Sequence, residues 1–185
     1  MDSNRRDINF ENLFCKDKVQ VMGCGTVEHA TKVVKDKLRS LPKTVLIHLG
    51  TNDLNKMSPQ QYLSELSDLV KYLMDKGCTV YVSELLPRKD GNQGLSDPVN
   101  DMLHKLVPEG NRISHPTITH AHLYDEVHLR RNINEGEKYS GAQVLAIDFY
   151  RVVYKTVPMD SRISRSLSGN KRSSSRNRLI GRGGH

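Results

Sequence analysis

The sequence lacks several features that would place it in a special class of protein. It has no apolar run near the length of about 18 residues that a membrane-spanning helix needs, so we expect no transmembrane segment. No apolar segment follows Met1–Arg6, as it would in a secretory signal peptide. Cysteine is scarce, and the odd number of three (Cys15, Cys24 and Cys78) without zinc-ligand spacing excludes a disulfide framework. These absences favour a reducing compartment, and we expect a cytoplasmic protein.

Acidic residues are absent from one end of the chain. Residues 161–185 contain no Asp or Glu, but they contain seven basic residues: Arg162, Arg165, Lys171, Arg172, Arg176, Arg178 and Arg182. These account for the whole net charge of +7, because residues 1–160 carry 21 basic and 21 acidic side chains. The same segment has seven serines and four glycines, too little apolar surface to offset the entropy cost of ordering. We therefore expect one domain over residues 1–158 and a disordered, basic, Ser/Arg-rich tail over 159–185.

Within residues 1–158, short apolar runs alternate with helical patterns, which is typical of a parallel α/β sheet. The nearly continuous apolar run over 44–49 predicts a strand covered on both faces. Further strands are expected over 18–22 and 78–82, and a last short strand is expected within 112–118, interrupted by Pro116. Helices are expected over 28–41, 99–106 and 140–157, with a polar loop over 87–97.

One further helix is the best specified element of the sequence. Ser58 is an N-cap residue, Pro59 occupies the first helical position, and Gln61 predicts a capping box. Apolar residues follow at helical spacing, and Gly77 predicts the end of the helix.

Polar residues and glycines follow two of the expected strands, at the ends where ligands gather in an open parallel sheet. Gly50–Asp53 follows the most apolar strand, and Gly23 and Gly25 follow the strand expected over 18–22. Glycines bring backbone N–H groups close to an anion, and the Asn52 amide can donate to the same point. Ordinary strand-to-helix turns are the alternative interpretation.

A second group of polar residues lies shortly before the last expected helix. Asp125 and His128 are three residues apart, so their side chains can meet on one turn, where the carboxylate orients the imidazole. A surface ion pair is the alternative. A metal cluster of His128 with His115, His120 and His122 is not expected, because these histidines have no compact ligand spacing.

In chain order, these pieces resemble the motifs of the SGNH (GDSL-type) hydrolase family. Asp2-Ser3-Asn4 matches its first block, with Met1 in place of a glycine, and Gly50–Asp53 matches the Gly-x-Asn-Asp block in full. Asp125 and His128 match the Asp-x-x-His block. The oxyanion glycine of the second block corresponds to Gly25, with Gly23 as the alternative. The similarity extends over about residues 2–157 and is strongest to the SGNH domains associated with animal non-LTR retrotransposons.

The resemblance implies a fold and a reaction. The fold is a three-layer α/β/α, flavodoxin-like parallel sheet. Ser3 is implied as the nucleophile, His128 as the general base and then acid, and Asp125 as the residue that orients it. The oxyanion hole is implied to consist of the Ser3 N–H, the Gly25 N–H and the Asn52 side chain, with no metal or cofactor. Because the family's first strand precedes its nucleophile, we expect a domain that lacks this strand and is truncated at its N-terminus.

Two functions of different classes follow from these observations. The first is a serine esterase that hydrolyses carboxylic esters of small substrates through a Ser3 acyl-enzyme, as the intact Asn52, Asp125 and His128 favour. The second is a non-catalytic SGNH-like module that binds RNA or protein, with the basic tail as an electrostatic arm. In either case we expect weak binding of nucleic acid through residues 161–185.

Overall fold

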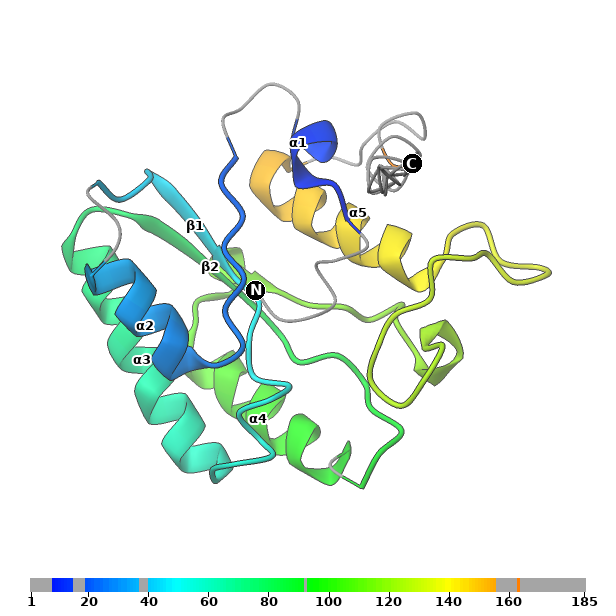
Figure 1. Cartoon of the computed structure of the whole chain (residues 1–185), viewed down its shortest axis with the longest axis horizontal. Coiled ribbons are helices and arrows are strands. Elements are labelled where there is room, and N and C mark those ends of the chain that lie inside the picture. The colour runs from blue at the N-terminus through cyan, green and yellow to red at the C-terminus, as the bar shows by residue number, and fades with distance from the viewer. Residues whose placement is uncertain (1–7, 15–18, 37–39, 92, 156–162, 164–185) are drawn as a thin grey trace, which may run out of the picture.

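The computed structural model of the chain describes residues 8–14, 19–36, 40–91, 93–155 and 163. In this part of the chain, a parallel sheet of three strands in the spatial order β1-β2-β3 forms the centre of the molecule (Figure 1). The sequence therefore predicted the α/β class correctly.

The three strands lie where the sequence placed them, although they are shorter. β1 is Thr44–Ile47, β2 is Thr79–Ser83 and β3 is Arg112–Ile113. Val45 lies opposite Val80 in the first pair of strands. The short strand expected within 112–118 is Arg112–Ile113, and Pro116, beyond its end, has no N–H to donate to a ladder.

Helices cover both faces of the sheet. Their bounds are Phe10–Leu13 (α1), Val27–Asp36 (α2), Pro59–Asp75 (α3), Gln93–Leu106 (α4) and Gly141–Tyr154 (α5). Two short 3-10 turns are η2, Glu109–Asn111, and η3, His120–His122. The helices α2, α3 and α4 pack on one face, and α1 and α5 pack on the other (Figure 1).

The side chains of the strands alternate between two apolar clusters. Along β1, Val45 and Ile47 pack with α2, α3 and α4, whereas Leu46 packs with α1 and α5. Along β2, Val80 joins the first cluster and Tyr81 the second. Successive side chains of a strand point to opposite faces, so a sheet covered on both faces requires the nearly continuous apolar runs in the sequence.

Serine side chains cap the N-termini of α3 and α5, and the cap at Ser58 confirms the prediction from the sequence. Ser58 Oγ accepts from the Gln61 N–H at 3.2 Å, and Ser140 Oγ accepts from the Gln143 N–H at 3.3 Å. Gln143 completes a capping box by accepting from the Ser140 N–H at 2.7 Å. Gln61 instead donates to Glu65 at 3.3 Å, so only half of the capping box expected there forms.

The helix α4 begins earlier than the sequence predicted. It starts at Gln93, so the last residues of the expected polar loop 87–97 are helical, and Pro98 lies inside the helix. Proline removes one helical hydrogen bond. Leu95 packs against the larger apolar cluster, and this apolar burial counteracts the loss of the bond.

The strand expected over 18–22 does not form in its described part, residues 19–22. A cavity of about 930 Å³ is lined by these residues and by β1, with further lining residues from α1, α2 and α5. Neighbouring strands of a sheet lie only about 4.8 Å apart, so a segment across such a cavity from β1 has no ladder partner there. This is the physical reason why the prediction was wrong.

Several predictions fall on other parts of the chain. Residues 1–7, including Ser3, and the tail 159–185 apart from Ile163 lie outside the described residues. Ile163 is buried. Among the helices described, none is long and apolar enough to cross a membrane.

Candidate functional site

Asp125 and His128 form a tight pair, as their spacing predicted. Asp125 Oδ2 lies 2.7 Å from His128 Nδ1. The other oxygen, Oδ1, accepts from the backbone N–H groups of Val127 at 2.8 Å and His128 at 2.7 Å. The carboxylate therefore both folds the turn and orients the ring, which places the Nε2 atom as the one that can exchange a proton with a substrate or nucleophile.

The surroundings of the pair keep Asp125 ionised. Its partial desolvation raises the pKa, but the hydrogen bonds from Val127 and His128 outweigh this, and the pKa of Asp125 falls to about 2. The side chains remain accessible, at 38% for Asp125 and 32% for His128. Tyr124 stacks on the imidazole with ring centroids 5.7 Å apart. An accessible imidazole held by an ionised carboxylate can act as a general base.

The loop Gly50–Asp53 is fixed to the turn before α2 by two side chains. Asn52 Nδ2 donates to the carbonyl oxygen of Gly25 at 3.1 Å, and Asp53 Oδ1 accepts from the Val27 N–H at 3.1 Å. The glycine that contacts Asn52 is Gly25, which the family resemblance favoured over Gly23. The Asn52 amide has a second hydrogen, so it can donate to one more acceptor at the same place.

Gly50 is required by the tight packing of this loop. Its φ of 122° is one that residues with a Cβ rarely adopt. A Cβ at this position would also lie 2.5 Å from Leu85 Cδ2 and 2.7 Å from the Tyr62 hydroxyl. Since Tyr62 donates to the Leu49 carbonyl at 3.0 Å, the end of β1 is held against α3 by a buried bond.

Asp53 is fully buried at the end of the same loop. Burial is the main reason that the pKa of Asp53 is raised, and the nearby Glu65 raises it further, although the Val27 N–H acts in the opposite direction. Its Oδ2 atom has no hydrogen-bond partner among the described residues. The arrangement gives Asp53 a structural role, since its carboxyl group reaches no solvent.

Arg88 joins the parts of the candidate site, and sequence analysis missed it. It is 3% exposed, and it donates from Nη1 to the carbonyl oxygen of Thr51 at 2.6 Å. From Nη2 it donates to Asn55 Oδ1 at 3.2 Å, and Asp90 accepts from its Nε at 2.8 Å. The only signal for Arg88 in the sequence is a charged residue in a polar loop, which ordinarily means a solvated side chain.

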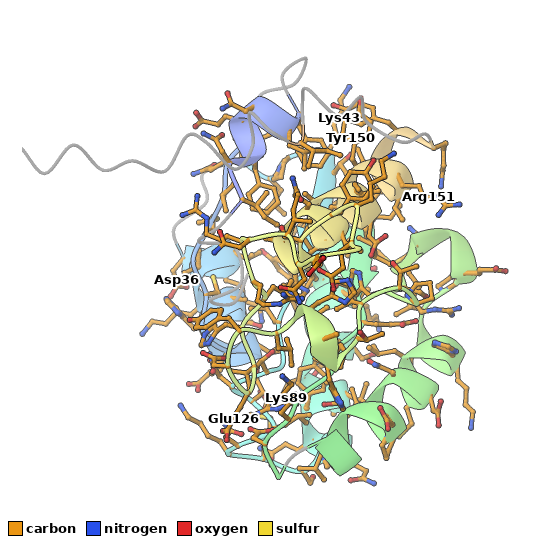
Figure 2. All side chains as sticks on the ribbon, turned by 90° about the vertical axis from the view of Figure 1, so that its right-hand side faces the viewer. Asp36, Lys43, Lys89, Glu126, Tyr150 and Arg151 are labelled. Carbon is orange, nitrogen blue, oxygen red and sulfur yellow. The ribbon has the colours of Figure 1, made fainter. Side chains whose placement is uncertain are left out.

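The residue after Arg88 reaches the second part of the site. The Lys89 N–H donates to the carbonyl oxygen of Glu126 at 2.8 Å. Figure 2 shows Lys89 and Glu126 at the same end of the molecule, away from Lys43 and Tyr150. The segment 88–89 thus links the Gly50–Asp53 loop to the turn of Asp125 and His128, and two motifs far apart in the sequence share one end of the fold.

The structure therefore brings together Gly25 with Asn52, and Asp125 with His128, and connects the two pairs through Arg88 and Lys89. Ser3 lies outside the described residues. Among the described residues, no group of three or more His, Cys, Asp or Glu side chains could hold a metal ion. In comparisons with known proteins, no protein-family model and no curated protein matches the chain.

Proposed function

We propose that the chain is an SGNH-type serine hydrolase that cleaves carboxylic esters of small substrates. The observation that carries the proposal is the Asp125–His128 pair, in which a carboxylate holds one ring nitrogen at 2.7 Å and leaves the ring accessible. An accessible ring that an ionised carboxylate holds in one orientation is what a general base requires. The order of the motifs along the sequence supports the same assignment.

In the proposed reaction, Ser3 Oγ attacks the acyl carbon of the ester while His128 Nε2 takes the hydroxyl proton. Asp125 stays ionised and stabilises the imidazolium, consistent with its pKa of about 2. The tetrahedral intermediate collapses, the bond to the alcohol breaks, and the imidazolium gives its proton to the departing alkoxide. Water then attacks the acyl-enzyme with His128 again as base, which releases the acid and regenerates Ser3.

The negative oxygen of the intermediate needs hydrogen-bond donors. Asn52 supplies the second hydrogen of its amide, and the Gly25 and Ser3 N–H groups supply the others. The bond from Asn52 to the Gly25 carbonyl fixes the amide plane, so that the donor is held before substrate arrives. The alternative, a non-catalytic module that binds RNA or protein, uses none of this geometry.

A fluorophosphonate probe and a short p-nitrophenyl ester test the proposal. We expect the probe to label Ser3, located by peptide mapping, and we expect Ser3→Ala and His128→Ala to abolish turnover. Asn52→Ala removes a single oxyanion donor and should leave an enzyme slowed roughly 100- to 1000-fold. His120→Ala is the matched control, because His120 is an exposed histidine outside the pair, and it should retain the wild-type rate. Turnover by Ser3→Ala at the wild-type rate would refute the proposal.

A further inference from the structure

Four side chains that sequence analysis did not connect form one continuous chain of hydrogen bonds. His48 Nδ1 lies 2.7 Å from Ser83 Oγ, and Ser83 Oγ lies 2.7 Å from His115 Nε2. His115 Nδ1 lies 2.8 Å from Asp148 Oδ2. The first three residues are 2%, 1% and 6% exposed, and the Asp148 side chain is 13% exposed, so the chain lies inside the protein.

This row of hydrogen-bonded side chains, His48–Ser83–His115–Asp148, crosses the carboxyl end of the sheet. His48 directly follows β1, Ser83 is the last residue of β2, and His115 comes two residues after β3. Asp148 reaches the chain from α5, on one face of the sheet. The hydrogen bonds thus connect the ends of all three strands to each other and to the helix that covers them.

Each of the three strands whose ends these hydrogen bonds connect leads into one part of the candidate site. β1 leads into Gly50–Asp53, β2 leads into the segment 88–90 with its buried arginine, and β3 leads into the turn 125–128. A shift of any strand end therefore displaces one part of the site relative to the other two. A chain of hydrogen bonds across the three ends opposes such a shift.

Ser83 is the central residue of the hydrogen-bonded row, since both histidines contact its hydroxyl. A carboxylate only accepts hydrogen bonds, so His115 carries a proton on Nδ1 toward Asp148 and presents Nε2 to Ser83. Ser83 Oγ also lies 3.1 Å from the Glu84 carbonyl, so this one hydroxyl contacts three groups. The ring of Phe149 packs edge-on against both imidazoles, at 5.5 Å from His48 and 5.9 Å from His115. This packing holds the two rings at the hydroxyl.

We infer that Ser83, with His48, His115 and Asp148, is a positioning unit that sets the relative placement of the three loops of the candidate site. The effect on catalysis rests on the proposed function, but the effect on loop placement does not. A buried network of hydrogen bonds that joins several elements opposes movement of these elements relative to one another. Residues that support a site in this way typically contribute about 10- to 100-fold to its activity.

The test compares two buried serines and two substitutions of one aspartate in the full chain. Ser83→Ala removes the hydroxyl that joins His48 to His115. Ser96→Ala removes a hydroxyl that is equally buried, at 1% exposed, and has no partner among the described residues. Asp148→Ala removes the acceptor for His115, and Asp148→Asn keeps an acceptor oxygen. The aspartate variants preserve the test if Ser83→Ala does not fold.

Nuclear magnetic resonance gives a readout that does not depend on activity. We expect Ser83→Ala and Asp148→Ala to shift the signals of the Asn52 side-chain amide and the His128 ring, and Asp148→Ala to change the ring-nitrogen shifts of His115. Ser96→Ala and Asp148→Asn should leave the Asn52 and His128 signals near their wild-type positions. Unchanged Asn52 and His128 signals in both Ser83→Ala and Asp148→Ala would overturn the inference.

Ester hydrolysis separates this inference from the proposed function. We expect kcat to fall about 10- to 100-fold in Ser83→Ala and Asp148→Ala with little change in KM, and we expect Asp148→Asn to recover most of the rate. If the wild type hydrolyses no ester but the Asn52 and His128 signals shift, the positioning unit stands and the proposed function fails. If the wild type is active and Ser83→Ala matches Ser96→Ala in rate and spectrum, the positioning unit fails.

Discussion

Arg88 Nη1 donates to the carbonyl oxygen of Thr51 at 2.6 Å, so a buried guanidinium holds the loop that contains Asn52. The same guanidinium bonds Asn55 and forms an ion pair with Asp90. A planar group with five donors can satisfy these acceptors together, and a lysine ammonium on a flexible stem cannot match that geometry.

We therefore expect Arg88→Lys to lower the free energy of unfolding by about 1–3 kcal/mol, because at least one buried acceptor loses its partner. Urea unfolding of the full chain measures this difference. Arg151→Lys is the matched control, since Arg151 is exposed on α5 (Figure 2), and it should change stability by less than about 0.5 kcal/mol. Equal effects of the two substitutions would contradict the assigned role of Arg88.

The low pKa of Asp125 predicts a loss of stability in acid. Its pKa in the folded protein is about 2, below the ordinary value of 3.8, so the unfolded chain binds this proton more readily. The contribution of Asp125 is therefore present above about pH 4 and is lost as the pH falls toward 2. Comparing unfolding of the wild type and Asp125→Asn across this range checks the effect, because the variant lacks this titration. The stability difference between them should shrink with falling pH; a constant difference would count against the prediction.

Asp53 predicts the opposite dependence on pH. Burial raises its pKa above 3.8, so the folded protein binds this proton more readily than the unfolded chain does. Stability is highest where Asp53 is protonated, and this contribution disappears as the pH rises through the raised pKa. Asp53→Asn keeps an oxygen to accept from Val27 and removes the buried charge, so we expect the variant to gain stability relative to the wild type as the pH rises above about 4. A relative stability that does not change over this range would show that Asp53 does not titrate as proposed.

The cavity beside β1 predicts that the sheet gains stability from one more strand. The cavity of about 930 Å³ is lined by all four residues of β1 as well as by residues 19–22, so it lies where a neighbouring strand would pair with β1. The lining residues belong to both apolar clusters, so the added strand must be apolar at every position. We expect six or seven apolar residues ending in Gly, placed before Asp2, to raise the melting temperature.

The matched control for this extension is a segment of equal length built from Ser, Asn and Gly. Among the described residues, the edge of β1 away from β2 has no partner strand. Such an edge favours association, so we expect the chain without the extension to be poorly soluble or dimeric. Light scattering and thermal unfolding measure both properties. Identical, cooperative, monomeric unfolding with and without the apolar extension would show that β1 does not accept another strand.

The basic tail is expected to bind RNA independently of the folded domain. Its seven positive charges have no acidic partner in residues 161–185, so binding should weaken steeply with salt and show little sequence preference. The full-length chain can be compared with a version that ends at Ser164, which keeps the buried Ile163 and removes six of the seven basic residues. The comparison is made at about 150 mM salt, where surface charges are screened beyond about 8 Å. We expect only the full chain to bind, with equal ester hydrolysis by both. Equal RNA binding by both would move the binding site to the folded domain.

Elements with local causes could be predicted from the sequence alone. Ser58 with Pro59 begins α3, and Ser140 begins α5, because an N-cap side chain satisfies N–H groups only two or three residues away. The pairing of Asp125 with His128 is also local, since one turn of the backbone brings the two side chains together. The apolar run that contains β1 also predicted burial on both faces, and this is what the two apolar clusters show.

Features that depend on partners far apart along the polypeptide could not be predicted from the sequence and are seen only in the tertiary structure. Asn52 meets Gly25 across 27 residues, and Arg88 meets Thr51 across 37. The sequence predicted no partner for His115, since a metal cluster was not expected there, yet its Nε2 lies 2.7 Å from Ser83 Oγ, 32 residues away. The strand expected over 18–22 needed a neighbour that the described sheet does not supply, and its apolar pattern could not reveal this. Periodicity reports which face of a segment is buried, whereas a hydrogen-bond partner far along the chain is fixed only when the strands align.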